Sequence, residues 1–110
     1  MSIDQTEIID FVSIEKSNGE VVLTISDHLP WEEDEEEHLL LLQEKINAYL
    51  RFIESGEMFR KVPRSEGRNI VIDVVMKFPL SPNAQIFLER AKAAVEEADF
   101  GLRWRNFQPN

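Results

Sequence analysis

The stretch NIVIDVVMKF, residues 69–78, constrains the fold more than any other part of the sequence. Its apolar residues occupy both alternating faces, and only Asp73 and Lys77 interrupt the pattern. A strand that is apolar on both faces is typical of the interior of a sheet, where it has neighbours on either side. The chain must therefore supply at least two more strands to flank this segment.

Two earlier segments, residues 8–16 and 20–28, are rich in β-branched residues and are predicted to be strands. Ser17, Asn18 and Gly19 lie between them, and Asn and Gly tolerate the positive φ that tight turns require. The pattern predicts a β-hairpin. A final alternating segment, residues 102–107, is predicted to be the fourth strand.

Helical periodicity marks two further segments. Residues 33–55 carry Leu39, Leu42 and Ile53 on one face, and Gly56 is typical of the position just past a helix. Residues 81–98 begin with Ser81 as an N-cap followed by proline, which favours a second amphipathic helix. The basic segment 57–68 contains Pro63 and Gly67 and is predicted to be a loop.

The expected order is thus β-β-α-β-α-β, with residues 1–110 forming one domain. The second helix should connect two parallel neighbouring strands through a right-handed crossover. Because both helices follow the hairpin, we expect them to cover one face of a four-stranded mixed sheet. The predicted fold is an α+β two-layer sandwich.

The composition excludes several classes of protein. A net charge of −9 argues against nucleic-acid binding, which depends on clustered Lys and Arg. The chain lacks an apolar run of about 18 residues, so no membrane span is expected. With no Cys and no secretory signal in its first residues, the sequence predicts a cytoplasmic protein.

The charge is unevenly distributed along the chain. Residues 1–57 contain fifteen acids against three bases, whereas residues 58–110 contain six acids against nine bases. Such an asymmetry can steer oppositely charged surfaces together. Interleaving of the two halves on folding would partly cancel it.

Three blocks of the sequence resemble a family of small bacterial proteins known only as a domain of unknown function. They are GEVVLTISDHLPW (19–31), EHLLLLQEKINAYLRFIESGE (37–57) and VIDVVMKFP (71–79). The resemblance covers nearly the whole chain and implies one domain. It implies no activity, cofactor or catalytic residue.

The acidic run from residue 32 to residue 37 is the most unusual local feature. Carboxylates in the first turn of a helix interact favourably with its dipole, by about 0.3 to 1 kcal/mol each. Six consecutive acids also repel one another, so helix stability does not explain the surplus. We expect a non-enzymatic protein-interaction module that binds a basic partner protein through Glu33, Asp34, Glu35, Glu36 and Glu37.

The alternative is a metal-dependent enzyme or small-ligand-binding protein. Imidazoles and carboxylates are ligands of Zn, Mn and Fe, and His28 and His38 bracket the acidic run. The candidate residues of this alternative are His28, Asp27, Asp34 and His38. The sequence contains no paired-histidine motif, nucleophile elbow or phosphate-binding glycine loop. We therefore assign no catalytic residue, metal ligand or cofactor.

Two other groups of residues are candidate contact surfaces. Leu41, Ala48 and Phe52 form a second apolar stripe on the first helix, beside Lys45, and we expect it to be a homodimer interface. Asp73, Arg103 and Arg105 should meet on the sheet face opposite the helices. They would form either a cross-strand ion pair or a polar surface for a partner or an anion.

Overall fold

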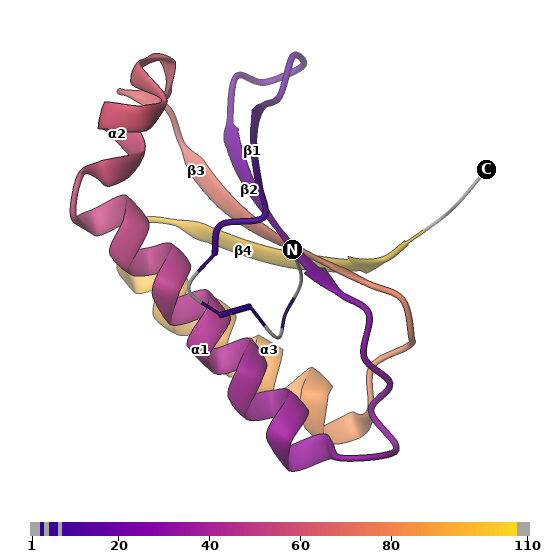
Figure 1. Ribbon diagram of the computed structural model, residues 1–110. Helices are drawn as coiled ribbons and strands as arrows, with labels where there is room; N and C mark the ends of the chain where they lie inside the picture. The colour runs from indigo at the N-terminus through magenta and orange to yellow at the C-terminus, as the bar shows by residue number, and fades with distance from the viewer. Residues whose placement is uncertain (1–2, 4, 7, 108–110) are drawn as a thin grey trace.

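The computed structural model describes residues 3, 5–6 and 8–107, and these form an α+β fold with a four-stranded mixed sheet (Figure 1). The strands are β1 (Phe11–Ile14), β2 (Val21–Asp27), β3 (Ile70–Met76) and β4 (Gly101–Asn106). The helices are α1 (Glu35–Glu54), α2 (Glu57–Lys61) and α3 (Pro82–Glu97), with a short 3₁₀ helix η1 (Pro63–Ser65). The predicted fold class is confirmed.

The strands lie in the order β1-β2-β3-β4. β1 pairs with β2 in the antiparallel sense, and β2, β3 and β4 run parallel. The apolar segment 69–78 therefore supplies an interior strand, as its composition predicted. β4 returns beside β3 after α3, so the crossover joins two parallel neighbours.

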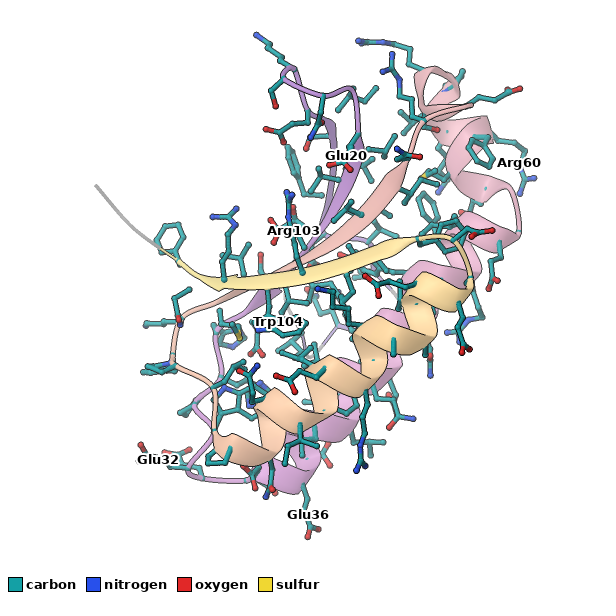
Figure 2. The ribbon with its side chains drawn as sticks, turned by 180° about the vertical axis from the view of Figure 1, so that it is seen from behind. Glu20, Glu32, Glu36, Arg60, Arg103 and Trp104 are labelled. Carbon is teal, nitrogen blue, oxygen red and sulfur yellow. The ribbon has the colours of Figure 1, made fainter. Side chains whose placement is uncertain are left out.

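The two long helices lie on one face of the sheet (Figure 1). The residues of one register row on that face, Leu23, Ile72 and Leu102, are almost completely buried. The adjacent row faces the other way and contains Thr24, Asp73 and Arg103. Figure 2 shows Arg103 and its neighbour Trp104 on opposite sides of β4, with Trp104 toward the helices. We call the side that bears Arg103 the open face.

α1 begins two residues later than predicted and ends one residue earlier. Leu42, Ile46 and Ile53 are buried against the sheet, in agreement with the helical period. Gly56 follows the helix with a φ of 83°, in the left-handed region that glycine adopts without strain. This turn leads directly into α2.

The prediction that residues 57–68 form a loop is wrong for much of its length. The segment contains α2 and η1, and Met58 and Ser65 are completely buried. Pro63 does not break the structure because it starts the 3₁₀ helix, where its missing N–H is not needed. One buried methionine in a basic segment of this length gave too little periodicity to reveal the helix.

The first strand is also shorter than predicted, because β1 begins at Phe11 rather than at Ile8. The N-terminal cap of α3 agrees with the sequence, since the Ser81 side chain accepts a hydrogen bond from the backbone N–H of Ala84 at 3.1 Å.

Among the described residues, no helix combines the length and the apolar character that crossing a bilayer requires.

Candidate functional site

The acidic run lies at one end of the molecule, where Glu32 and Glu36 point outward (Figure 2). α1 starts only at Glu35, so the first three acids precede the helix. Five of the six carboxylate residues are exposed, and we call them the acidic surface: Glu32, Glu33, Asp34, Glu36 and Glu37.

Glu35 is the exception within the run, because it joins the starts of the two long helices. Its Oε1 accepts a hydrogen bond from the side-chain amide of Asn83 at 3.0 Å. Hydrogen bonds from Ser81 and from Asn83 lower the pKa of Glu35 below its usual value. One of the five predicted partner-binding residues therefore has a structural contact within the chain.

A buried His–Asp pair lies beneath the acidic surface. His38 is 2% exposed, and its Nε2 lies 2.6 and 2.8 Å from the two carboxylate oxygens of Asp27. Its Nδ1 lies 3.3 Å from the carbonyl oxygen of Pro30. The oxygens of Asp27 and Pro30 face the two ring nitrogens, so a ring N–H of His38 can donate to either of them.

Trp31 completes this cluster. Its ring stacks on the His38 ring with centroids 3.5 Å apart and 10° between the planes. Asp27 Oδ1 also accepts a hydrogen bond from the backbone N–H of Leu29 at 3.1 Å. Asp27, Trp31 and His38, which we call the loop anchor, thus fix both ends of the loop that leads into the acidic run.

This arrangement does not bring together the candidate ligands of the metal-site alternative. Both ring nitrogens of His38 already face protein acceptors, and His28 is exposed. Within residues 3, 5–6 and 8–107, no group of three or more His, Cys, Asp or Glu side chains could hold a metal ion. The geometry of the described residues gives the metal-site alternative no support.

The second apolar stripe of α1 is covered by the chain itself. Ala48 and Phe52 are buried, and Leu41 is partly buried against the core. Residues Ile8, Ile9 and Val12 line a hollow with Ala48 and Phe52, so the segment before β1 lies over this side of the helix. Most of the stripe that was predicted to be a homodimer interface is therefore not exposed.

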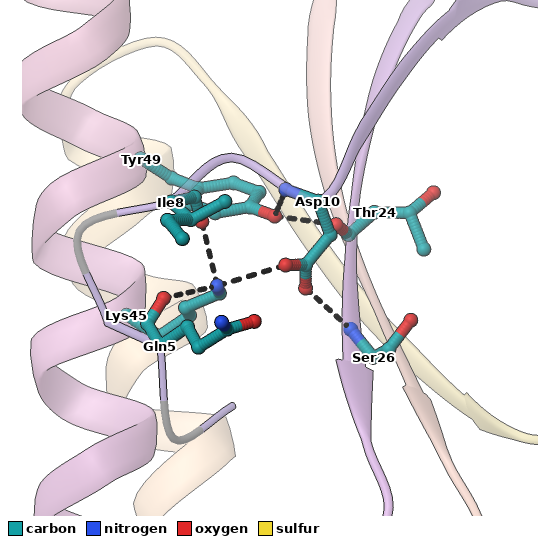
Figure 3. Close-up of polar contacts among 7 residues, drawn as sticks. All are labelled: Gln5, Ile8, Asp10, Thr24, Ser26, Lys45 and Tyr49. Atoms are coloured by element: carbon teal, nitrogen blue, oxygen red, sulfur yellow. Dashed lines mark hydrogen bonds and ion pairs between the residues drawn. The ribbon is translucent and has the colours of Figure 1, made fainter. Parts of the chain in front are cut away.

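Lys45, in the middle of that stripe, is completely buried. Its Nζ donates to the carbonyl oxygens of Gln5 at 2.7 Å and Ile8 at 2.6 Å, and to Asp10 Oδ1 at 2.9 Å (Figure 3). The other carboxylate oxygen of Asp10 accepts a hydrogen bond from the backbone N–H of Ser26 on β2 at 3.0 Å. Lys45 therefore ties the N-terminal segment to both α1 and the sheet.

Tyr49, one turn further along α1, joins the same network (Figure 3). Its hydroxyl donates to the carbonyl oxygen of Thr24 at 2.5 Å and accepts from the backbone N–H of Asp10 at 2.8 Å. Burial raises the pKa of the Tyr49 phenol above its ordinary value. We call Asp10, Lys45 and Tyr49 the lysine cluster.

Reasoning from the sequence missed the lysine cluster and the loop anchor. The available signal for the first was a single lysine within an apolar stripe, and for the second a histidine next to a leucine run. In both cases the side-chain hydrogen-bond partners of that residue lie at least eight residues away and follow no helical or strand period.

The open face brings the three predicted sheet residues together. The Asp73 side chain is 2% exposed, and its Oδ2 accepts a hydrogen bond from Arg105 Nε at 3.1 Å. Arg103 Nε lies 3.5 Å from the other carboxylate oxygen. The side chains of Arg103 and Arg105 remain 47% and 59% exposed.

Comparison with known proteins gives one match. A family model described as a family of unknown function, DUF6572, matches residues 1–108. No curated protein and no solved structure matches the chain significantly.

Proposed function

Because the chain belongs to DUF6572, a family of unknown function, its role has to be inferred from its surfaces, and we propose that it is a non-enzymatic protein-interaction module. Its acidic surface would bind a basic segment of a partner protein. The observation that carries this proposal is a small hollow beside the acidic surface that suits a lysine or arginine side chain.

The hollow has a volume of about 100 Å³ and combines two kinds of lining. Its lining includes the apolar residues Leu29, Pro30 and Leu41 and the acidic residues Glu33, Asp34 and Glu37. Lysine and arginine have an apolar stem and a charged head, and they bury the stem along apolar surface while the head stays near polar groups. The lining therefore matches both parts of such a side chain.

The loop anchor supports the same proposal. The stacked Trp31 and His38 rings and the Asp27 carboxylate hold the loop before α1 in place through contacts within the chain. A surface that is already ordered loses less conformational entropy when a partner binds. The acidic residues are thus presented on a fixed support.

The proposal is tested with a variant in which four acidic-surface residues are neutralised: Glu33→Gln, Asp34→Asn, Glu36→Gln and Glu37→Gln. Glu35 is kept because it contacts Asn83. A matched control neutralises four exposed acids elsewhere on the helices: Glu44, Glu54, Glu96 and Glu97, each to Gln. Circular dichroism verifies that both variants are folded.

A blocked lysine-rich peptide serves as the probe in an NMR titration at low salt and at about 0.5 M salt. We expect the largest shifts at the backbone amides of Leu29, Glu33 and Leu41, and about tenfold weaker binding in the four-site variant or at high salt. Equal binding by the four-site variant and the matched control would contradict a specific acidic surface. A pull-down from the native host with the same proteins then identifies the natural partner.

A further inference from the structure

We propose that the open face of the sheet is a second binding site, in which Arg103 and Arg105 bind carboxylates of an acidic protein segment. The site does not depend on the acidic surface, which lies at the end of the molecule where α1 begins. The argument rests on how Asp73 holds the two arginines.

Both arginines contact Asp73 through Nε. The distances are 3.5 Å from Arg103 and 3.1 Å from Arg105, and the carboxylate between them is almost completely buried. The two arginines are two residues apart on β4, so their Cα atoms are about 7 Å apart on one face. The buried carboxylate thus orients two neighbouring guanidinium groups.

The terminal nitrogens of both groups remain available. Among the described residues, neither guanidinium has a hydrogen bond or an ion pair with a residue other than Asp73. A guanidinium presents donors in a planar fork that matches the two oxygens of a carboxylate. Arg105 Nε is hydrogen-bonded to Asp73, and Arg103 Nε lies beside the other oxygen of the same carboxylate. Because both side chains are about half exposed, the two guanidinium groups are held near each other while their terminal nitrogens face solvent.

The surroundings add a further positive charge and apolar surface. A hollow of about 450 Å³ lies next to Arg105 on the same face, lined in part by Val75, Lys77 and Phe107. Phe107 is 58% exposed, and Phe11, which shares a register row with Asp73, is 60% exposed. Cations beside exposed aromatic rings favour a ligand that carries both carboxylates and apolar groups.

An acidic protein segment fits this surface better than a nucleic acid. The face gives three cations against one buried carboxylate, and these cations lie on β4 or just after β3. β1 contains no charged residue, and β2 contains only Asp27. A long phosphate backbone needs clustered cations along its whole path, which this short patch does not supply. A short segment needs only two carboxylates in register with the arginines and an apolar residue for Phe11 or Phe107.

The probe is a blocked peptide of four glutamates and one phenylalanine, titrated into the isotope-labelled protein. We expect shifts in the backbone amides of Val71, Asp73, Arg103 and Arg105, and none with the same peptide carrying glutamine in place of glutamate. This measurement uses the unmodified protein, so its outcome does not depend on the stability of a variant. Absence of binding, or shifts confined to the basic segment 57–68, would overturn the proposal.

Two variants test whether the arginine forks beside Asp73 bind the peptide. Arg103→Lys combined with Arg105→Lys keeps the charge and removes the forks, and we expect about tenfold weaker binding of the peptide. Arg60→Lys combined with Arg90→Lys, two exposed arginines on helices, is the matched control and should bind as the wild type does. Asp73→Asn removes the orienting carboxylate and adds positive charge, and we expect weaker binding in spite of that charge.

Four results would contradict the assignment. Unchanged affinity in the double lysine variant, or tighter binding by Asp73→Asn, would show that charge alone governs binding. Tighter binding of a single-stranded oligothymidine than of the peptide would show that the occupant is a nucleic acid. Concentration-dependent self-association that the peptide does not displace would show that the face is used by a second copy of the chain.

Discussion

Lys45 shows how one residue can hold a whole segment in place. A buried ammonium group is stable only where hydrogen bonds and a counter-ion replace its water. Lys45 obtains two carbonyl oxygens and the Asp10 carboxylate from the segment before β1. This single side chain therefore positions Gln5, Ile8 and Asp10 over α1.

We predict that Lys45→Met lowers the free energy of unfolding by about 3 to 5 kcal/mol, because it leaves the Asp10 carboxylate buried without its cation. Chemical denaturation followed by circular dichroism measures the loss. Lys45→Met combined with Asp10→Asn should recover part of it, because the uncompensated charge is then gone. A double variant that is less stable than Lys45→Met alone would contradict this account.

Tyr49 gives a prediction for alkaline pH. Burial raises the pKa of its phenol above the ordinary 10.0, so the folded protein holds the proton more tightly than the unfolded chain does. The stability that neutral Tyr49 contributes is therefore complete below pH 10.0 and is lost as the pH rises from there through the folded-state pKa.

The chain has one tyrosine, so the near-ultraviolet absorbance of tyrosinate reports Tyr49 alone. We expect this absorbance to appear together with the loss of the folded circular dichroism signal. In Tyr49→Phe the free energy of unfolding should fall less steeply above pH 10.0 than in the wild type. Tyrosinate that forms near pH 10.0 in a fully folded protein would contradict the prediction.

At the scale of the element, the strongest sequence patterns predicted the structure well. Residues 69–78 alternate over two apolar faces and form β3, and the Ser81–Pro82 start of α3 is found where the capping preference places it. These elements follow a local period or a local hydrogen bond. Long-range packing changes neither their type nor their start.

The segments that the sequence described poorly are those whose structure depends on distant residues. Residues 8–10 are apolar enough for a strand, yet Lys45 and Tyr49 on α1 bind this part of the backbone instead. α2 forms because Met58 reaches the core from a largely polar segment. The open-face cluster was predictable because strand pairing aligns Asp73 with Arg103.

The burial of the second α1 stripe changes what a mutation there should do. We predict that Phe52→Ala lowers the free energy of unfolding by about 3 to 5 kcal/mol, because it opens a cavity beneath the N-terminal segment. Leu40→Ala, on the same helix but 47% exposed, is the control and should change stability by less than about 0.5 kcal/mol. Denaturant unfolding measures both variants. A small effect of Phe52→Ala, together with a reduced molecular mass, would instead point to a subunit interface.

For the molecule as a whole, the exposed acids and the exposed cations are concentrated in different places. The acidic surface is at the start of α1, whereas the cations of the open face, Arg103 and Arg105 on β4 and Lys77 just after β3, lie on the sheet. Folding therefore does not cancel the asymmetry completely. Repulsion among the exposed acids persists in the folded state and lowers its stability at low ionic strength.

We predict that salt stabilises the protein. At about 1 M salt the screening length is about 3 Å, shorter than the spacing of most exposed acids, so repulsion is nearly abolished. The free energy of unfolding should rise by about 0.5 kcal/mol or more relative to low salt. The four-site variant should gain less, since four of the repelling charges are gone. Equal salt dependence of the two proteins would show that repulsion within the acidic surface does not lower the stability.

β4 ends the sheet, and in the described part of the chain no strand pairs with its outer edge. Such an edge can recruit a strand from another molecule and start polymerisation. If two copies met there in antiparallel register about Trp104, Arg103 of each would lie opposite Arg105 of the other, and like charges directly opposite destabilise the pairing. The repulsion between these arginines would thus oppose aggregation through this edge, and a ligand that neutralised them would reduce that repulsion.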